Sequence, residues 1–304
     1  MDLDLSADQV ALRDGIEALL QGRFDSDRVR AGFDRAMFDE LHEAGVFSLR
    51  RDGFAWADCV VVFEQLGRYC VPGPLVSSLL VSEGIVGLVE RAPTVWIEHL
   101  EALDALLVLD GERAALLDPG ALDADPSPWP LDPCTPVWRA SDLPGGTPYV
   151  CDVAEWRRAG AVLTAALALG LADRLTEMTV AYASERVQFD RPIGGFQAVK
   201  HLCADMVTRV EVARAAVYAA GAHLDDPELP GLDRSIAAAK VVAGDAAVVN
   251  GKSATQVHGG MGFTWEVDVH LYLKRAWVLE THFGGADEHA DRLGELLTTG
   301  SAGG

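Results

Sequence analysis

The sequence VKHLCADMVTRVEVARAAV occupies residues 199 to 217 and carries the strongest helical pattern in the chain. Its apolar residues follow one another at intervals of 3, 4, 4, 3 and 4 positions; they are Val199, Leu202, Met206, Val210, Ala213 and Val217. These intervals match the 3.6-residue period of an α-helix, so the segment is predicted to form a long amphipathic helix with one apolar face.

Three further helices are predicted around this segment. An Ala- and Leu-rich stretch covers about 159 to 184, a second covers 233 to 256, and a last one lies near 287 to 298. Four helices of this kind form a bundle, because each has to bury an apolar face against the others. The residues from Asp225 to Gly231 are interpreted as a plain turn between two of them. We therefore predict a C-terminal four-helix bundle from residue 156 to residue 304.

The first part of the chain, residues 1–91, is predicted to be a helical domain. Ser6 is followed three positions later by Gln9, a capping-box pattern, and apolar residues then recur at helical spacing. A second helix is predicted around Met37 to Ala44, and a third is predicted to end before Gly67.

Residues 92–155 are predicted to form a small β domain. Two apolar runs, 106–109 and 114–117, flank Asp110-Gly111, which predicts a β-hairpin. Several prolines divide the following residues into loops and short edge strands. The predicted fold class is therefore mainly α, with an N-terminal helical domain, a reduced β module and the bundle.

Composition limits the possible partners. The net charge of -21 argues against nucleic acid and anionic membranes, because both would repel the protein. The acidic start, Met1 to Asp4, differs from a basic signal peptide, and no run of about 18 apolar residues is apparent. The five cysteines are scattered without a Cys-x-x-Cys pair, which indicates reduced thiols and no metal site. A cytoplasmic protein is expected.

Two sequence blocks carry a resemblance to a known family. The first runs from Arg186 to Ile193 as RVQFDRPI and continues with FQAVKH from Phe196; the second, QVHGGMGFT, begins at Gln256. Further similarities lie at 38–45, 63–68 and 72–74. In this order the blocks resemble the acyl-CoA dehydrogenase family. Members of that family have an α domain, a β domain and a four-helix bundle, and they oxidise acyl-CoA thioesters to enoyl-CoA with FAD.

The resemblance implies a set of cofactor contacts. In the family the matching residues reach an FAD held mainly by the neighbouring subunit; here they are Arg186, Phe189, Gln256, Gly259 and Gly260. An arginine can neutralise the diphosphate, and glycines let backbone N–H groups approach it closely. Phe189 is expected one helical turn from Arg186, so that both point at one ligand. The structural alternative makes Arg186 a solvated helix-end charge, Phe189 a core aromatic and the glycines a helix C-cap.

The chain departs from the family at the catalytic base. Most members place a glutamate directly before a glycine beyond the paired glycines, and the matching position here is Phe283, before Gly284. Others use a glutamate on the first bundle helix, where this chain has Gly160. Phenylalanine and glycine cannot accept the proton that the reaction removes. The carboxylates considered as substitutes are Glu155, Asp173 and Glu280, and the catalytic residue stays unassigned.

The β module is also only about half as long as the family's, and no counterpart of the flavin-covering Thr-Glu-Pro and Gly-Ser-Asp stretch is found between Leu109 and Cys151. Both departures match the shortened subunit of heteromeric acyl-CoA dehydrogenases for steroids, which are heterotetramers. The resemblance then implies FAD as cofactor, a larger acyl-CoA dehydrogenase subunit as partner, an acyl-CoA substrate and an electron-transferring flavoprotein as acceptor. Two alternatives stay open: a self-sufficient dehydrogenase with a relocated carboxylate, and a non-enzymatic acyl-CoA-binding or scaffold protein.

Overall fold

A computed structural model describes residues 4–300 of the chain. Met1, Asp2 and Leu3, which belong to the predicted acidic start, and the last four residues lie outside the described part. Within it the chain divides into two compact units. The helical unit comprises residues 4–25, 56–70 and 161–300, and the mixed unit comprises residues 26–55 and 71–160. The boundaries near residues 91 and 155, which the sequence predicts between the helical domain, the β domain and the bundle, stay predictions.

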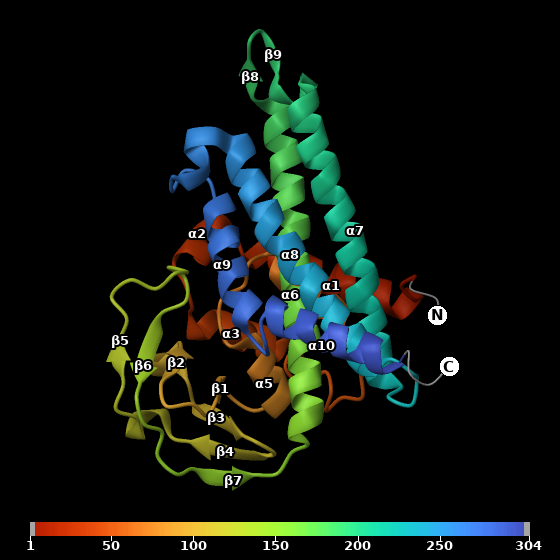
Figure 1. Ribbon diagram of the computed structural model, residues 1–304. Helices are drawn as coiled ribbons and strands as arrows, with labels where there is room; N and C mark the ends of the chain where they lie inside the picture. Colours follow the sequence, from red (N-terminus) through yellow and green to blue (C-terminus); the bar gives the residue numbers. More distant parts are fainter. Residues whose placement is uncertain (1–3, 301–304) are drawn as a thin grey trace. The chain divides into compact units, whose positions relative to one another are not determined.

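The helical unit is built from long helices that lie side by side (Figure 1). In chain order its elements are α1 (Ala7–Arg23), α4 (Trp56–Arg68), α6 (Val153–Glu185, which begins in the mixed unit), β8 (Val187–Gln188), β9 (Arg191–Pro192), η3 (Ile193–Gly195), α7 (Gln197–Asp225), α8 (Leu232–His258), η4 (Gly259–Phe263), α9 (Val269–Thr281) and α10 (Ala286–Gly300). The fold is mainly helical with a small β module, as predicted.

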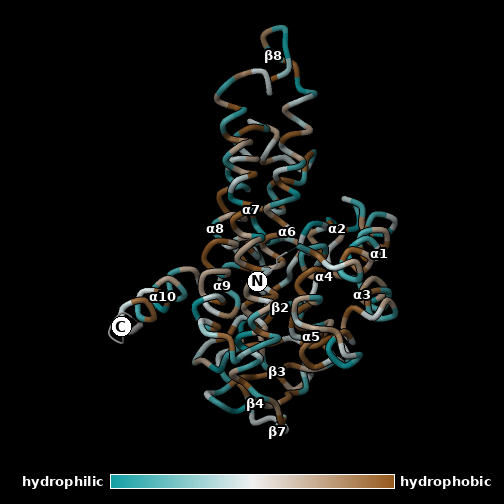
Figure 2. Tube along the Cα trace, turned by 90° about the vertical axis from the view of Figure 1, so that its right-hand side faces the viewer, coloured by the Kyte–Doolittle hydropathy of each residue, from teal (hydrophilic) through white to brown (hydrophobic). Residues whose placement is uncertain are grey.

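The apolar stripe that predicted α7 is buried over most of its length. Met206, Val210, Ala213 and Val217 are at most 2% exposed. Val199, near the start of the helix, is only half-buried, because the first turns of α7 extend beside the β8–β9 hairpin. Hydrophobic and hydrophilic residues alternate along α7 and α8 accordingly (Figure 2).

Two polar contacts fix helices of this unit to one another. The Asn250 amide on α8 donates to Thr176 Oγ1 on α6 at 3.1 Å and to the Met206 carbonyl on α7 at 3.1 Å, so one buried side chain ties three helices together. The Asp225 carboxylate accepts hydrogen bonds from the backbone N–H groups of Trp56 and Ala57 and so caps α4. Asp225 therefore does more than the plain turn that the sequence indicated.

The helix α4 continues through Gly67 to Arg68, past the end that the sequence predicted before Gly67. A Cβ built at Gly67 would lie 2.1 Å from the Leu167 carbonyl oxygen of α6, and one built at Gly170 would lie 2.0 Å from the Glu64 carbonyl oxygen. Glycine is needed at both positions because the two backbones cross in contact. The glycine that seemed to end the helix instead permits this crossing.

One helix of this unit, α9, was not predicted. The 13 residues of α9 are buried on nearly every side, including the polar residues His270 and Arg275, so the segment lacks the one-sided apolar stripe of an amphipathic helix. The capping box at the start of α1 is confirmed, since Gln9 N–H donates to Ser6 Oγ and the Gln9 side chain accepts from Ser6 N–H.

The mixed unit contains two small sheets and three short helices. Its elements are α2 (Ser26–Arg30), α3 (Arg35–Glu43), α5 (Leu75–Val81), β1 (Val86–Glu90), β2 (Val95–Glu98), η1 (Leu100–Ala102), β3 (Ala105–Asp110), β4 (Arg113–Leu117), η2 (Pro119–Ala121), β5 (Asp125–Pro126), β6 (Val137–Ala140) and β7 (Thr147–Tyr149). One sheet has the order β1-β3-β4-β7 with β1 parallel to β3, and the other has the order β2-β6-β5 and is antiparallel.

The predicted hairpin is confirmed as β3 and β4, with a shifted turn. Asp110 pairs with Arg113, so the two turn residues are Gly111 and Glu112 rather than Asp110 and Gly111. Gly111 has a φ of 59°, the left-handed conformation that such turns require.

By length and composition alone, α6 would be able to span a bilayer. However, 89% of its apolar window is buried inside the protein, as in the core helix of a bundle.

Candidate functional site

Arg186 and Phe189 lie on a β-hairpin, not on a helix. The helix α6 ends at Glu185, and β8 pairs with β9 across a two-residue turn formed by Phe189 and Asp190. Both turn residues have positive φ, 53° and 61°, as in a type I′ turn. The expected spacing of one helical turn between Arg186 and Phe189 was therefore wrong. The chain leaves the helix and returns at once, because the Arg186 carbonyl accepts a hydrogen bond from Ile193 N–H at 2.8 Å.

The Phe189 ring is 86% exposed, so the alternative that made it a core aromatic is also wrong. The Phe189 ring nevertheless packs against a neighbouring side chain. Its ring lies edge-on to Phe196 with centroids 6.0 Å apart, and the Arg191 guanidinium lies 4.0 Å from the Phe196 ring centroid. A held but exposed aromatic ring is typical of a binding surface.

The other predicted residues lie at the end of α8. Gln256 is exposed on the last turn, and Gly259 caps the helix with φ 62° and ψ -139°. Its N–H donates to the Gln256 carbonyl. The C-cap alternative is thus confirmed for Gly259. Gly260 differs, because its φ lies outside the positive range and a Cβ built on it meets nothing within 4 Å. Neither the backbone conformation nor the packing requires glycine at position 260. A ligand that approaches the backbone closely would explain why this residue has no side chain.

A ring stack joins the two segments. Tyr182, on the last turn of α6, and His258, the last residue of α8, have ring centroids 4.1 Å apart and planes inclined by 20°. Arg186 follows Tyr182 by one turn, and Gly259 follows His258 directly. All five predicted cofactor contacts therefore lie at one end of the helical unit, where the β8–β9 hairpin projects (Figure 1). Two more exposed aromatics, Phe263 (72%) and Trp265 (56%), follow α8 closely along the chain.

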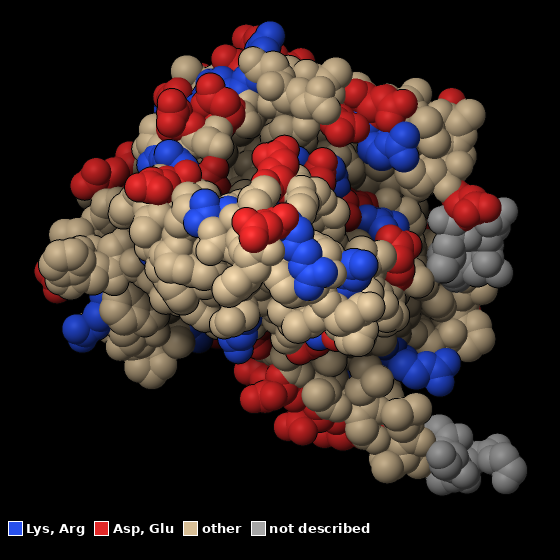
Figure 3. All heavy atoms as spheres, turned by 90° about the horizontal axis from the view of Figure 1, so that it is seen from above, with Lys and Arg blue, Asp and Glu red and all other residues tan. Residues whose placement is uncertain are grey.

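The charge of the chain does not exclude an anion at this end. Seen along the helices from the hairpin end, basic and acidic side chains are interspersed (Figure 3). Arg186 and Arg191 are both exposed on the hairpin. A phosphate there would meet local arginines and exposed backbone N–H groups rather than a uniform negative field.

Several hydrogen bonds hold the turn at Phe283 and Gly284, where the resemblance places the family's usual catalytic base. Phe283 and Gly284 connect α9 to α10 with φ values of 55° and 91°. The buried Lys240 ammonium donates to the carbonyls of Leu279, Glu280 and His282 at 3.4, 3.3 and 2.7 Å. Burial lowers the pKa of Lys240 to about 8.

Of the three carboxylates near the two usual base positions, Glu280 and Asp173 have structural contacts. Glu280 Oε1 accepts from Ala286 N–H at 2.9 Å and caps α10. Asp173 is ion-paired with Arg68 and with Arg214. Glu155 is exposed on the first turn of α6. Gly160 is buried, in the mixed unit, and supplies no side-chain acceptor.

A buried carboxylate that sequence reasoning passed over is Glu64, which is 3% exposed. Burial raises its pKa, as in some catalytic acids. Both oxygens are occupied, however: Oε1 accepts from Arg214 at 3.2 Å and Oε2 from the Tyr218 hydroxyl at 2.6 Å. Glu64 lies in the block that resembles the family at 63–68, but only the fold reveals that distant residues hold it.

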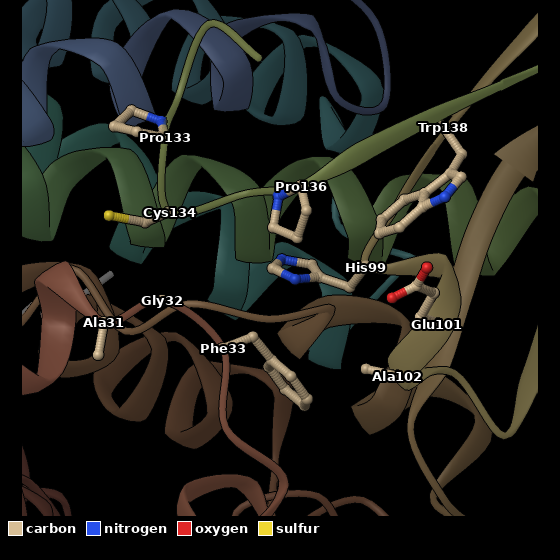
Figure 4. A pocket seen from close by; sticks show the side chains of 10 residues that line it. All are labelled: Ala31, Gly32, Phe33, His99, Glu101, Ala102, Pro133, Cys134, Pro136 and Trp138. Atoms are coloured by element: carbon tan, nitrogen blue, oxygen red, sulfur yellow. The ribbon is translucent and has the colours of Figure 1, made fainter. Parts of the chain in front are cut away.

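The mixed unit has a separate cavity of about 340 Å³ (Figure 4). His99, Phe33, Pro136 and Trp138 surround it, and Glu101 directs a carboxylate toward it. None of the residues that line it is lysine or arginine, so it does not match a phosphate-bearing ligand. Among the residues that the structure describes, no group of three His, Cys, Asp or Glu side chains is arranged to hold a metal ion.

Comparison with known proteins supports the resemblance. The model of the family "Acyl-CoA dehydrogenase, C-terminal domain" matches residues 153–295. The chain is 32% identical to "Acyl-CoA dehydrogenase IpdE2" of Mycolicibacterium smegmatis over 95% of its own length and 98% of that protein. Among solved structures, "Tcur3481-Tcur3483 steroid ACAD G363A variant" has a TM-score of 0.82 at 20% identity and covers 97% of the chain and 99% of that structure's chain. The "ChsE4-ChsE5 complex from Mycobacterium tuberculosis" has a TM-score of 0.80 at 21% identity, with coverage of 98% and 99%.

Proposed function

Because this chain belongs to the acyl-CoA dehydrogenase family, we propose that it is the shortened subunit of a heteromeric, FAD-dependent enzyme of that family. In this proposal the larger subunit holds the flavin ring and supplies the catalytic base. This chain contributes contacts to the distal part of the same FAD. The observation that carries the proposal is the turn at Phe283, where an apolar residue stands at the family's base position and Lys240 and Glu280 hold the surrounding backbone in place.

The proposed cofactor contacts are Arg186, Phe189, Gln256, Gly259 and Gly260. Their exposure supports the proposal, because a ligand held by another subunit has to be reached from the surface. When FAD is bound it accepts hydride from the substrate. The residues of this chain would bind and orient its far end: the arginine faces the diphosphate, the glycine backbone admits it closely, and the Phe189 ring covers an apolar part.

The names of two similar structures support a heteromeric assembly and a steroid-derived substrate. One is a complex of two named proteins, and the other is a two-protein steroid enzyme. We accordingly propose a larger acyl-CoA dehydrogenase subunit as partner in a heterotetramer, a steroid-derived acyl-CoA as substrate and an electron-transferring flavoprotein as acceptor. We also propose a cytoplasmic location, because the five cysteines are scattered along the chain without a Cys-x-x-Cys pair, as in proteins of a reducing compartment.

The test is to produce the chain together with the acyl-CoA dehydrogenase subunit encoded beside it and to measure the affinity of the purified complex for FAD. Arg186→Ala should weaken FAD binding about 10- to 100-fold, because a charge-assisted hydrogen bond contributes about 1.5 to 3 kcal/mol. Arg234→Ala is the matched control. Arg234 is an exposed arginine near the start of α8, about 33 Å of helix away from Gln256 and about 38 Å away from Gly259.

The alternatives give different results. A scaffold with a vestigial flavin site would tolerate Arg186→Ala as well as Arg234→Ala. A self-sufficient dehydrogenase would be purified alone with FAD bound and would reduce that FAD when an acyl-CoA is added. Either result would overturn the proposal.

A further inference from the structure

We infer that Tyr182 and His258 form a positioning pair that holds the two cofactor-contact segments in register. The inference rests on the proposed function, since it concerns how the FAD contacts are placed. One segment is the hairpin with Arg186 and Phe189. The other is the end of α8 with Gln256, Gly259 and Gly260.

Each ring is attached to its segment by a short backbone connection. Arg186 N–H donates to the Tyr182 carbonyl at 2.8 Å, so Arg186 is fixed to the residue that stacks. On the other side, His258 directly precedes Gly259, whose N–H donates to the Gln256 carbonyl. A movement of either ring would therefore shift the residues that face the ligand.

The stack itself has little freedom. The planes are nearly parallel, with centroids 4.1 Å apart, and His258 is only 6% exposed. The His258 Nδ1 atom lies 2.8 Å from the Ala254 carbonyl, so Nδ1 carries the proton and the ring orientation is fixed. The Tyr182 hydroxyl reaches Met261 Sδ at 4.0 Å and so connects α6 to η4 as well.

The stack is separate from the contacts that hold the helices together. Two turns deeper in the bundle, Asn250 joins α8 to Thr176 of α6. That contact stays when the stack is removed. Loss of the Tyr182 ring is therefore expected to loosen the end of the unit without unfolding it.

The experiment measures FAD affinity in the complex with the larger subunit, together with the melting temperature of the FAD-free complex. Tyr182→Leu removes the ring and should raise the Kd for FAD about 10-fold, with little change in melting temperature. Tyr182→Phe keeps the ring and loses only the hydroxyl, so its Kd should stay within about 2-fold of the unaltered complex. His258→Leu is the second variant and should match Tyr182→Leu.

A double variant separates positioning from general stability. Arg186 is the contact bonded directly to Tyr182, so most of the pair's effect should pass through it, and adding Tyr182→Leu to Arg186→Ala should weaken FAD binding by less than about 3-fold more. A full further 10-fold loss, or a Kd for Tyr182→Leu equal to that of Tyr182→Phe, would overturn the inference. The inference would also be overturned if Tyr182→Leu and His258→Leu both lowered the melting temperature enough to explain their loss of FAD affinity.

Different results would refute the proposed function and the positioning pair. If Arg186→Ala leaves FAD affinity unchanged, the proposed function fails and the inference fails with it. If Arg186→Ala weakens FAD binding while Tyr182→Leu and His258→Leu do not, only the positioning pair is refuted.

Discussion

Replacing Lys240 with methionine should destabilise the chain by about 2 kcal/mol at neutral pH. The ammonium is 4% exposed and donates to three carbonyls around the end of α9. Its burial has a cost: the pKa falls from 10.5 to about 8, a difference that corresponds to about 3 kcal/mol. Methionine removes that cost, but it leaves the three carbonyls without a donor, at about 1 to 3 kcal/mol each when water cannot reach them. The fully buried carbonyl should lose about 3 kcal/mol and the two partly buried carbonyls about 1 kcal/mol each, so the loss exceeds the gain by about 2 kcal/mol.

The destabilisation by Lys240→Met should increase as the pH rises. The folded chain has the lower Lys240 pKa, so between about pH 8 and 10.5 the unfolded chain binds more protons at this site. The contribution of Lys240 to stability should therefore rise with pH through that window, and its burial cost is fully present below pH 8. At pH 9.5 the destabilisation by Lys240→Met should reach about 4 kcal/mol.

The assay is urea unfolding of the full chain, followed by circular dichroism at pH 7 and pH 9.5. Lys252→Met is the matched control, because Lys252 is an exposed lysine on the same helix. A Lys240→Met variant as stable as Lys252→Met would refute the role of the ammonium as the cap of α9. A destabilisation that shrinks as the pH rises would refute the assigned direction of the pKa.

Three further predictions concern single positions. Gly260→Ala should leave the melting temperature of the chain unchanged and raise the Kd for FAD in the complex at least 5-fold. Its control, Gly259→Ala, should cost about 1 to 3 kcal/mol of folding free energy, because the backbone conformation of Gly259 is open almost only to glycine. Equal FAD affinities for Gly260→Ala and the unaltered chain would contradict a ligand role for Gly260. Glu280→Gln keeps an oxygen to cap α10, so turnover by the complex should stay within about 2-fold, and a loss of about 1000-fold would identify Glu280 as the base. Gly170→Ala should lower the free energy of unfolding by about 3 kcal/mol or prevent folding, since its Cβ would lie 2.0 Å from the Glu64 carbonyl oxygen. A chemical unfolding midpoint equal to that of the unaltered chain would show that the two helices can move apart.

Local patterns in the sequence predicted the elements whose pattern is itself local. The helix from residue 197 follows from one apolar stripe, the start of α1 from Ser6 and Gln9, and the β3–β4 hairpin from two apolar runs around a glycine. In each of these the residues that determine the structure are close together in the chain.

Elements that depend on distant contacts were missed. The helix α9 is enclosed on nearly all sides, so its apolar residues show no one-sided period. The parallel pairing of β1 with β3 joins segments that no turn connects. The role of Gly67 depends on Leu167, a hundred residues away in the chain.

The five candidate cofactor contacts stay a prediction, and their geometry differs from what the sequence indicated. The sequence did not indicate the hairpin that carries Arg186 and Phe189. Its turn residues, Phe189 and Asp190, lack the Asn-Gly or Asp-Gly pattern of most such turns, so a helix was predicted there. The Tyr182–His258 stack was not predicted, because His258 showed no metal or catalytic spacing and its partner lies 76 residues earlier.

The central claim is that this chain binds the far end of an FAD on which it performs no chemistry itself. The most direct measurement is the flavin absorbance of the purified chain, mixed with FAD, before and after a steroid-derived acyl-CoA is added, with and without the larger subunit. The account predicts that the flavin is bleached only when the larger subunit is present. Bleaching by this chain alone would contradict it.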